Sequence, residues 1–319
     1  MPFLQFQPIY HGRVWGGRAL ADWLGREVSG SQPIGESWEI VDRSEAQSVV
    51  SGGIEVGRTL RALIEARGAE IMGPGWDPMR RFPILVKWLD CRERLSLQVH
   101  PPASVAREFG GEPKTENWYV VRATAGAAVL AGVKAGVDAA QFRTALASEA
   151  AETLVERHST AAGDSLLIES GVMHAIDAGN VILEIQQNSD TTYRVYDWGR
   201  VGLDGKLRQL HVEQSLACFA ANTARPPKLI RAADPQLVLA DCREFRIRRI
   251  RLDAGERLSL AAREQVRILS VVDGALKEGE STLGRGANVL LPFADGFEFA
   301  VAESATVLIT DNFTSHEID

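Results

Sequence analysis

Cysteine is scarce in this chain of 319 residues, which contains only Cys91, Cys218 and Cys242. Three cysteines far apart in the sequence cannot build the disulfide framework of a small secreted domain, and none of them belongs to a Cys-x-x-Cys pair. A disulfide-stabilised scaffold is therefore excluded. We expect three free thiols in a reducing compartment.

The chain also lacks an excess of basic residues and any long apolar run. Its net charge of −7 argues against a general binder of nucleic acids or anionic membranes. No basic start followed by an apolar segment opens the sequence, so no signal peptide is predicted, and no stretch is long enough to span a bilayer. The predicted location is the cytoplasm, and an anionic substrate would require a locally basic pocket.

Short apolar segments broken by glycine, proline, aspartate and asparagine make up most of the chain. Many short strands with frequent turns favour a β-sandwich or β-barrel. Strands are predicted at residues 37–41, 84–89, 95–99, 118–121, 128–133, 165–168 and 181–186. Further strands are predicted at residues 245–252, 257–260, 266–272, 288–291, 297–301 and 305–310.

Helical periodicity occurs in only a few segments, at residues 59–67, 139–157 and 212–220. The longest, 139–157, lies between two groups of strands and is predicted to be an inserted helix. Residues 222–228 are polar and contain two prolines, which indicates a linker. We therefore predict two domains, residues 1–220 with a helical insertion near 139–157, and residues 225–319.

Four side chains suggest a metal centre. Gln98 and His100 are two residues apart on a predicted strand, so their side chains share a face. Glu116 follows sixteen residues after His100, and His174 follows much later. One amide oxygen, one carboxylate and two imidazoles suit Zn²⁺ or a related divalent metal, and they leave the bound ion with a net charge of about +1.

Several sequence motifs follow one another in a fixed order along the chain. They are Val-Trp-Gly-Gly at 14–17, Gly-Glu-Ser-Trp-Glu at 35–39, the strand at 82–87, the segment 95–101, Lys-Thr-Glu at 114–116, His174, and Tyr-Arg at 193–194. Together they resemble the short bacterial form of type I phosphomannose isomerase, a family of the cupin superfamily. The resemblance runs from about residue 10 to about residue 220 and weakens beyond.

The resemblance implies a mainly β fold of two cupin-type barrels, with a few helices in and around the first. It also implies a metal-dependent isomerase that interconverts mannose 6-phosphate and fructose 6-phosphate by moving a proton through a cis-enediol. The substrate would be a small sugar phosphate, and the four metal ligands would be Gln98, His100, Glu116 and His174. No nucleic-acid or membrane partner is expected.

A weak internal repeat supports the two-barrel arrangement. Residues 163–171 resemble residues 286–294, and both resemble the second conserved segment of a cupin. The first copy has Glu169 in place of the usual proline but keeps His174. The second copy keeps the proline as Pro292 but has Phe297 where the histidine would stand. The resemblance therefore implies one metal, in the first barrel, and none in the second.

The basic residues within the motifs are Lys87, Lys114 and Arg194. A fixed cation beside a metal can hold a sugar phosphate or stabilise an enediolate. Lys87 lies in an apolar strand, where it either reaches solvent or lines a cavity. The resemblance implies catalytic roles for Arg194, Lys114 and Asp190, and substrate contacts for Lys87 and Ser96.

The general base is left open by the sequence. Long-form members of the family have a histidine directly before the lysine of the Lys-x-Glu motif, but this chain has Pro113 there. The remaining choices are Lys114, Glu116, Asp190 and a metal-bound water. The native metal and the oligomeric state are also undetermined by the sequence.

Two other functions fit parts of the same pattern. Two histidines and one carboxylate suit the Fe(II) of a cupin oxygenase, although the extra Gln98 and the cations favour redox-neutral work on a phosphorylated sugar. A non-catalytic sugar-phosphate-binding cupin is the other alternative, because a fold alone does not fix a function.

Overall fold

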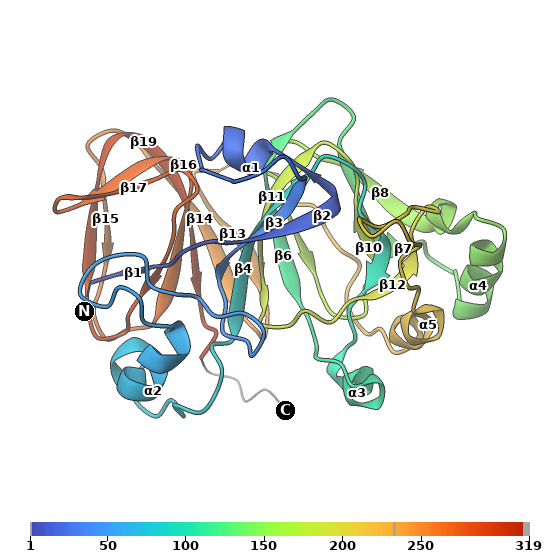
Figure 1. The fold of residues 1–319 in the computed structure, drawn as a ribbon, viewed down its shortest axis with the longest axis horizontal. Helices are drawn as coiled ribbons and strands as arrows, with labels where there is room; N and C mark the ends of the chain where they lie inside the picture. The colour runs from blue at the N-terminus through green and yellow to red at the C-terminus, as the bar shows by residue number, and fades with distance from the viewer. Residues whose placement is uncertain (1, 232–233, 315–319) are drawn as a thin grey trace. The chain divides into compact units, whose positions relative to one another are not determined.

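The computed structural model describes residues 2–231 and 234–314, which form a mainly β structure with a few short helices (Figure 1). The predicted mainly β class is therefore confirmed. The described chain divides into two compact units, one of residues 10–37 and 87–231 and the other of residues 2–9, 38–86 and 234–314. No helix among the described residues is long and apolar enough to cross a membrane.

The division into units differs from the predicted domains at the N-terminal end. Residues 2–9 and 38–86 group with the C-terminal residues, whereas the first domain was predicted to span 1–220. Long-range pairing is the reason, because β1 (Leu4–Gln5) pairs with β18 (Asn288–Leu291). The other border, at residue 231, lies close to the predicted linker.

Two sheets carry the residues of the predicted site. The first has the strand order β2 (Ile9–Gly17), β3 (Ile34–Ile40), β4 (Ile84–Cys91), β11 (Asn180–Gln187), β6 (Glu116–Ala123) and β9 (Ser165–Ile168). The second has the order β12 (Tyr193–Tyr196), β5 (Leu97–Val99), β10 (His174–Ile176), β7 (Ala128–Val133) and β8 (Val155–Ser159). Both sheets have open edges.

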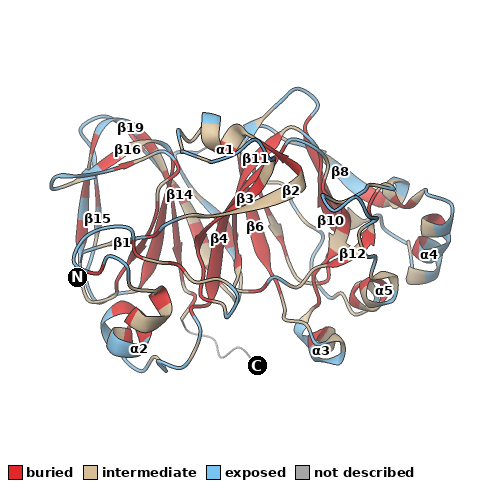
Figure 2. Ribbon diagram, viewed as in Figure 1, coloured by how far each residue is buried: buried red, intermediate tan, exposed pale blue. Residues whose placement is uncertain are grey.

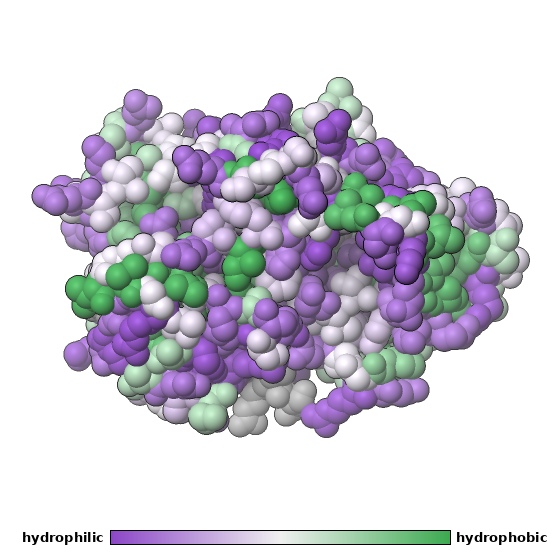
Figure 3. Space-filling view, viewed as in Figure 1, coloured by the Kyte–Doolittle hydropathy of each residue, from purple (hydrophilic) through white to green (hydrophobic). Residues whose placement is uncertain are grey.

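The two sheets face each other across a shared hydrophobic core. Buried Trp118, Val120 and Ile168 of the first sheet pack in one cluster with Val129 and Ile176 of the second. Figure 2 shows the strands as mainly buried and the outer helices as partly exposed. The face shown in Figure 3 is mostly hydrophilic, with hydrophobic side chains in scattered groups. Apolar burial between the sheets thus fixes the positions of the strands that carry the site.

The remaining sheet belongs to the C-terminal part of the chain. Its order is β1, β18, β16 (Arg267–Glu278), β19 (Phe297–Asp311), β14 (Arg246–Leu252) and β13 (Gln236–Asp241), with β15 (Arg257–Leu260) on β19 and β17 (Ser281–Gly284) on β16.

The strands predicted at 297–301 and 305–310 prove to be one strand, β19. The long strand β16 pairs with both halves of it and shifts register between Gly274 and Leu276. Gly274 has φ +71, and a Cβ there would lie 1.9 Å from the carbonyl oxygen of Ser304. Only glycine permits this close approach of β16 to the backbone of β19. The irregularity in β16 at this point lets the partner strand β19 continue without a break.

The helices are short and lie outside the sheets. They are α1 (Ala19–Asp22), α2 (Leu60–Ile71), α3 (Ala103–Ala106), α4 (Ala139–Ala147) and α5 (Val212–Ala220), with 3₁₀ turns η1 (Arg107–Phe109) and η2 (Ala151–Leu154). Thr59 caps α2 by accepting from Ala62 N, and Asp138 and Gln141 form a capping box at the start of α4.

The predicted helix over 139–157 is wrong in its second half. Helix α4 ends at Ala147, and Glu149 then adopts the left-handed conformation with φ 56. Residues from Val155 onward form β8, in which Val155 lies opposite Val133 of β7. The β-branched side chain is buried in that sheet, so tertiary pairing overrides the helical composition of the segment.

The internal repeat is present in the backbone. Gly163 N donates to Val120 O at 2.7 Å, and Val120 N donates to Asp164 O at 2.8 Å. In the second copy Gly286 N donates to Val271 O at 2.8 Å, and Val271 N donates to Ala287 O at 2.9 Å. The two glycines have φ 91 and φ 90. The same turn therefore precedes both β9 and β18.

Phe297, which replaces the repeat's histidine, belongs to an apolar core. Its ring stacks on that of Phe299, with centroids 6.2 Å apart and planes 12° apart. We expect Phe299→Ala to lower the free energy of unfolding by about 3–5 kcal/mol, because Phe299 is fully buried. Urea unfolding measures this, with exposed Glu298→Ala as the control. Equal unfolding midpoints for the two variants would contradict the assignment of this core.

Candidate metal centre and substrate pocket

One row of side chains crosses the five-stranded sheet. Gln98 of β5 lies opposite Arg194 of β12 on one side and opposite His174 of β10 on the other, and His174 lies opposite Ala131 of β7. Directly opposed residues of antiparallel strands project to the same face. Arg194, Gln98 and His174 therefore share one face of this sheet, and His100 joins it because it is two residues after Gln98.

The facing sheet supplies the carboxylate. Glu116 begins β6 and lies opposite Gln186 of β11, and Trp118 lies opposite Glu184 in the same pair of strands. The ring of Trp118 packs edge-on against His174, with centroids 5.5 Å apart. The packing of the two sheets thus brings Glu116 to the histidines, although the three residues are far apart in the sequence.

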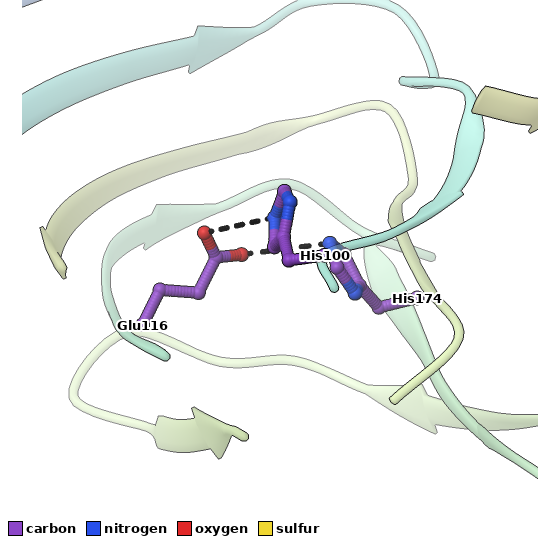
Figure 4. A group of neighbouring side chains, drawn as sticks. All are labelled: His100, Glu116 and His174. Carbon is purple, nitrogen blue, oxygen red and sulfur yellow. Dashed lines mark ion pairs between the residues drawn. The ribbon is translucent and has the colours of Figure 1, made fainter. Parts of the chain in front are cut away.

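His100, Glu116 and His174 form a compact buried cluster (Figure 4). One ligand atom from each lies within 4.8 Å of the others, and each side chain is only 1% exposed. Nε2 of His100 lies 3.3 Å from Glu116 Oε2, and Nε2 of His174 lies 3.6 Å from Glu116 Oε1. The predicted ligands are thus together, with Gln98 Nε2 at 3.3 Å from His174 Nε2.

The hydrogen bonds around the histidines fix which nitrogen faces the cluster. Nδ1 of His100 lies 2.8 Å from Thr191 O, and Nδ1 of His174 lies 2.8 Å from Val172 O. A carbonyl can only accept, so both Nδ1 atoms carry the proton and both Nε2 atoms present a lone pair. Metal-ligating histidines are usually oriented in this way.

Gln98 needs one rotation to complete the ligand set. Its Nε2 faces His174, while its Oε1 accepts a hydrogen bond of 3.2 Å from Ser96 Oγ. Turning the amide by half a turn lets Nε2 donate to the serine and presents Oε1 to the cluster. Amide oxygen and nitrogen have nearly the same shape, so the turn needs no repacking. The four residues therefore fit a divalent metal.

The carboxylate of Glu116 is ionised. Both of its oxygens are buried, and Lys114 Nζ lies 2.7 Å from Oε2. Burial alone would raise the pKa of Glu116, but the nearby charge of Lys114 outweighs burial and holds the pKa well below its usual range. Burial would lower the pKa of Lys114, but Glu116 and Glu184 raise it. Glu116 is therefore a negatively charged ligand beside a permanent cation.

The histidines are neutral in the metal-free protein. Burial and then the charge of Lys114 lower the pKa of His100, and burial followed by His100 lowers the pKa of His174 to about 3. Because the unfolded chain binds protons near pH 6.5, these groups stabilise the fold above that pH. The stability is then lost as the pH falls from about 6.5 toward the folded-state values.

We therefore expect the melting temperature of the metal-free protein to fall between about pH 6.5 and pH 4. The His174→Gln variant, which cannot take up this proton, should show a flatter profile over that range. Thermal unfolding followed by circular dichroism at several pH values measures both. Parallel profiles for the two proteins would show that His174 does not carry the dependence.

A pocket of about 600 Å³ opens beside the cluster. It is lined by Gln98, Lys114 and Ser96, and also by Lys87, Glu184, Asp190 and Arg194. Lys87 Nζ lies 3.6 Å from Glu184 Oε1 and 3.8 Å from Asp190 Oδ1. A chain of alternating charges thus runs from the cluster to the half-exposed Asp190, and it lines a pocket large enough for a small sugar phosphate.

Glu184 was missed in the sequence. It is buried, its Oε1 lies 3.9 Å from Lys114 Nζ, and its Oε2 accepts from Trp118 Nε1 at 3.1 Å. Burial and then the charge of Glu116 raise its pKa. A charged residue within the apolar run of β11 was a usable signal, of the same kind that singled out Lys87.

Arg194 lies at the pocket without a carboxylate partner. Its Nη1 donates to Gln209 O at 2.9 Å, while its Nε is buried and makes no hydrogen bond among the described residues. Burial and then the charge of Arg208 lower its pKa. Asp190, predicted to act with it, lies beside Lys87. Arg208 also lines the pocket and pairs with Asp197 at 2.7 Å.

The other histidines that the structure describes do not belong to the cluster. His158 Nε2 lies 3.4 Å from Ala131 O. His211 lines the pocket, and its Nδ1 accepts a hydrogen bond of 3.3 Å from Arg194 N. His316 lies outside the described residues. His211 is thus too close to Arg194 to serve as a neutral control in mutagenesis, and His158 is the suitable one.

Comparisons with known proteins identify the family of this chain. Residues 3–129 match the family model described as phosphomannose isomerase type I, catalytic domain. The chain is 32% identical over 320 residues to the mannose-6-phosphate isomerase ManA of Bacillus subtilis, covering 96% of this chain and 98% of that protein. It is 40% identical over 215 residues to the mannose-6-phosphate isomerase of Streptococcus mutans, covering 67% and 66%.

The fold is similar to a solved structure as well. The crystal structure of the mannose 6-phosphate isomerase from Bacillus subtilis superposes with a TM-score of 0.81 at 29% identity, and the match covers 97% of this chain and 99% of that one. The similarity therefore extends over both units and not only over the motifs.

Proposed function

This chain belongs to the type I phosphomannose isomerase family, and from that premise we propose that it interconverts mannose 6-phosphate and fructose 6-phosphate. The observation that carries the proposal is the buried group His100, Glu116 and His174, which opens onto a pocket with several cations. The reaction is an intramolecular isomerisation in which a proton moves between C2 and C1 of the open-chain sugar.

His100, His174, Glu116 and the rotated amide of Gln98 would hold one divalent ion, for which we propose Zn²⁺. When bound, this ion would supply Lewis acidity toward the oxygens of the substrate. Two neutral imidazoles and one carboxylate leave it a net positive charge, which suits that role. The support lies in the two Nε2 atoms, which lie 3.3 Å and 3.6 Å from the buried carboxylate oxygens of Glu116.

In this proposal the buried Ser96 does not contact the phosphate of the substrate directly. Its hydroxyl lies within hydrogen-bond distance of the Gln98 amide, so we assign it to holding that amide in place. Lys87, held between Glu184 and Asp190, remains a substrate-binding residue. We assign Arg208, which lines the same pocket as Arg194, to the anionic end of the substrate.

Proton transfer requires a base that can lose its proton near neutral pH. Lys114 cannot be that base while its raised pKa keeps it charged, so we assign it to stabilising negative charge on the substrate oxygens. Glu116 is committed to the metal in this proposal. The other carboxylates at the pocket are Glu36, Glu184, Asp190 and Asp204. Glu36 is paired with Arg13, Glu184 is buried and Asp204 lies in an exposed turn. Asp190 has 47% of its side chain exposed and lies 3.8 Å from Lys87 Nζ. We therefore propose Asp190 as the base.

A coupled assay tests the proposed function. The purified chain, loaded with Zn²⁺, should convert mannose 6-phosphate to fructose 6-phosphate, and chelation should abolish the conversion until metal is restored. Oxygen uptake, measured on the same preparation with Fe(II), should stay at background. Absence of isomerase activity with full metal occupancy would refute the proposal, and oxygen consumption would favour the oxygenase alternative.

We also propose that the protein works in the cytoplasm. The support is that Cys91, Cys218 and Cys242 are all free cysteines, as is usual in a reducing compartment.

A further inference from the structure

A second cavity, of about 660 Å³, lies in the unit that contains the metal centre. Its walls come from the ends of β2, β4 and β6, from the turn between β10 and β11, and from β8. It shares no lining residue with the substrate pocket. We call it the arginine pocket, because its lining includes Arg18, Arg92, Arg94, Arg122 and Arg157.

The arginine pocket carries an excess of positive charge. Five arginines line the pocket with two carboxylates, those of Asp90 and Asp177, and Glu152 pairs with Arg94 from outside the lining, which leaves an excess of two positive charges. This excess occurs in a chain whose net charge is −7. A concentration of one sign of charge in a cavity attracts ions of the other sign, so the ligand that suits this pocket is an anion.

Two of the arginines already have carboxylate partners. Arg94 pairs with the buried Asp177 and with Glu152, and Arg157 pairs with Asp177 at 2.8 Å. They form a fixed wall of the pocket. The uncompensated charge therefore belongs to the other three arginines.

Arg18, Arg92 and Arg122 have no ion pair with a described carboxylate. Arg18 Nη2 donates to Val28 O at 2.9 Å, but its Nη1 is buried without a hydrogen-bond partner. Asp90 Oδ2 accepts the backbone N–H of Ala19 at 2.6 Å. Burial raises the pKa of Asp90, whereas the nearby charges of Arg92 and Arg122 lower it, so these arginines share this one carboxylate. A guanidinium fork with free donors fits the oxygens of a phosphate group.

Gly17 allows the chain to pass close to Asp90 at one side of the pocket. A Cβ at this position would lie 2.7 Å from Asp90 Oδ2 and 3.1 Å from Arg92 Cβ. The end of β2 can therefore approach β4 only because residue 17 lacks a side chain. This close approach places Arg18 and Arg92 at one cavity.

The arginine pocket is separate from the metal centre. Strand β6 begins at Glu116 in the metal cluster, and Arg122 lies six residues further along it. At about 3.3 Å per residue this separates the two Cα atoms by roughly 20 Å. A molecule bound at the metal would not reach Arg122.

We propose that the arginine pocket is a second anion-binding site, which takes the phosphate group of a small phosphorylated molecule. Its volume of about 660 Å³ is close to the 600 Å³ of the substrate pocket, so a ligand of hexose-phosphate size fits. Free phosphate and a phosphorylated metabolite would present the same phosphate oxygens to the arginines, and the experiment distinguishes the two ligands.

Titration calorimetry of the metal-loaded full chain tests this at low salt. Inorganic phosphate and glucose 6-phosphate are each titrated into the wild type and into Arg92→Ser/Arg122→Ser, both exposed positions whose loss leaves the core intact. In the wild type we expect one binding component beyond that of the substrate pocket. The double variant should lose at least about tenfold in affinity for that component, because two charge-assisted contacts are removed.

The charge-matched control is Arg107→Ser/Arg257→Ser, which removes two exposed arginines elsewhere and should bind as the wild type does. The kcat and KM for mannose 6-phosphate should be unchanged in both double variants, so the outcome is independent of the proposed function. Tighter binding of glucose 6-phosphate than of phosphate would identify an organic ligand, and equal binding would identify free phosphate. Identical binding by the wild type and the Arg92/Arg122 variant would overturn the proposal.

Discussion

His100→Ala and His174→Ala should each lose the bound metal and the isomerase activity together. Each imidazole presents its Nε2 to the cluster, and either variant would leave three ligands, namely the other histidine, Glu116 and Gln98. A metal supplies several kcal/mol of charge stabilisation in a transition state, and each 1.36 kcal/mol is about tenfold in rate. We expect kcat to fall on the order of 10³-fold or more.

Folding must be separated from metal loss in this experiment. Both histidines are buried, so the variants should be compared with metal-free wild type by circular dichroism and thermal unfolding, alongside metal analysis and the coupled assay. His158→Ala is the control, because His158 lies on the edge strand β8, with its Nε2 3.4 Å from the carbonyl of Ala131, and is not part of the cluster. A His174→Ala protein that kept a full equivalent of metal would refute the assigned ligand set.

Arg194→Ala should lower kcat by about 10²–10³ and leave metal content and melting temperature nearly unchanged. Arg194 stands directly opposite Gln98 on the face that carries the metal ligands, and its Nε is buried without a hydrogen-bond partner. A guanidinium stays charged at any working pH, so it can stabilise a developing enediolate. The expected decrease in kcat is what the removal of one preorganised charge donor typically costs.

The competing interpretation makes Arg194 a structural residue. An ion pair with Asp190 would support it, but Asp190 lies 3.8 Å from Lys87, and the hydrogen bond of Arg194 goes to the carbonyl of Gln209. Melting temperature, metal content and kcat should be measured on one preparation. Early melting with normal turnover of the folded fraction would end the catalytic assignment. Asp190→Asn should be measured beside Arg194→Ala, because it removes the charge of Asp190 and leaves these Arg194 contacts intact.

The sequence determined the class of fold and the types of residue in the site. Alternating short apolar segments predicted most strands, and β7, β9, β15 and β18 have the predicted bounds. The two-residue spacing of Gln98 and His100 put both on one face, since side chains alternate along a strand. Such features depend on near neighbours in the chain, which is why they could be read without a structure.

Only the tertiary structure decided which distant residues meet. Glu184 lies between Lys87 and Lys114 because β11 and β6 pair, and its importance depends on that environment and not on its local sequence. The grouping of residues 2–9 with the C-terminal strands was likewise outside the reach of local patterns.

Helix α4 shows the same limit, because here the local sequence predicted a longer helix than the structure contains. Residues 139–157 have a helical composition, yet Val155 pairs with Val133 and the segment from there is a strand. Strand pairing buries side chains and satisfies backbone groups over long sequence separations, and those gains exceed the intrinsic preferences of single residues. The sequence by itself thus singled out the candidate ligands, while sheet pairing decided their surroundings, because burial and charge proximity arise only when the strands come together.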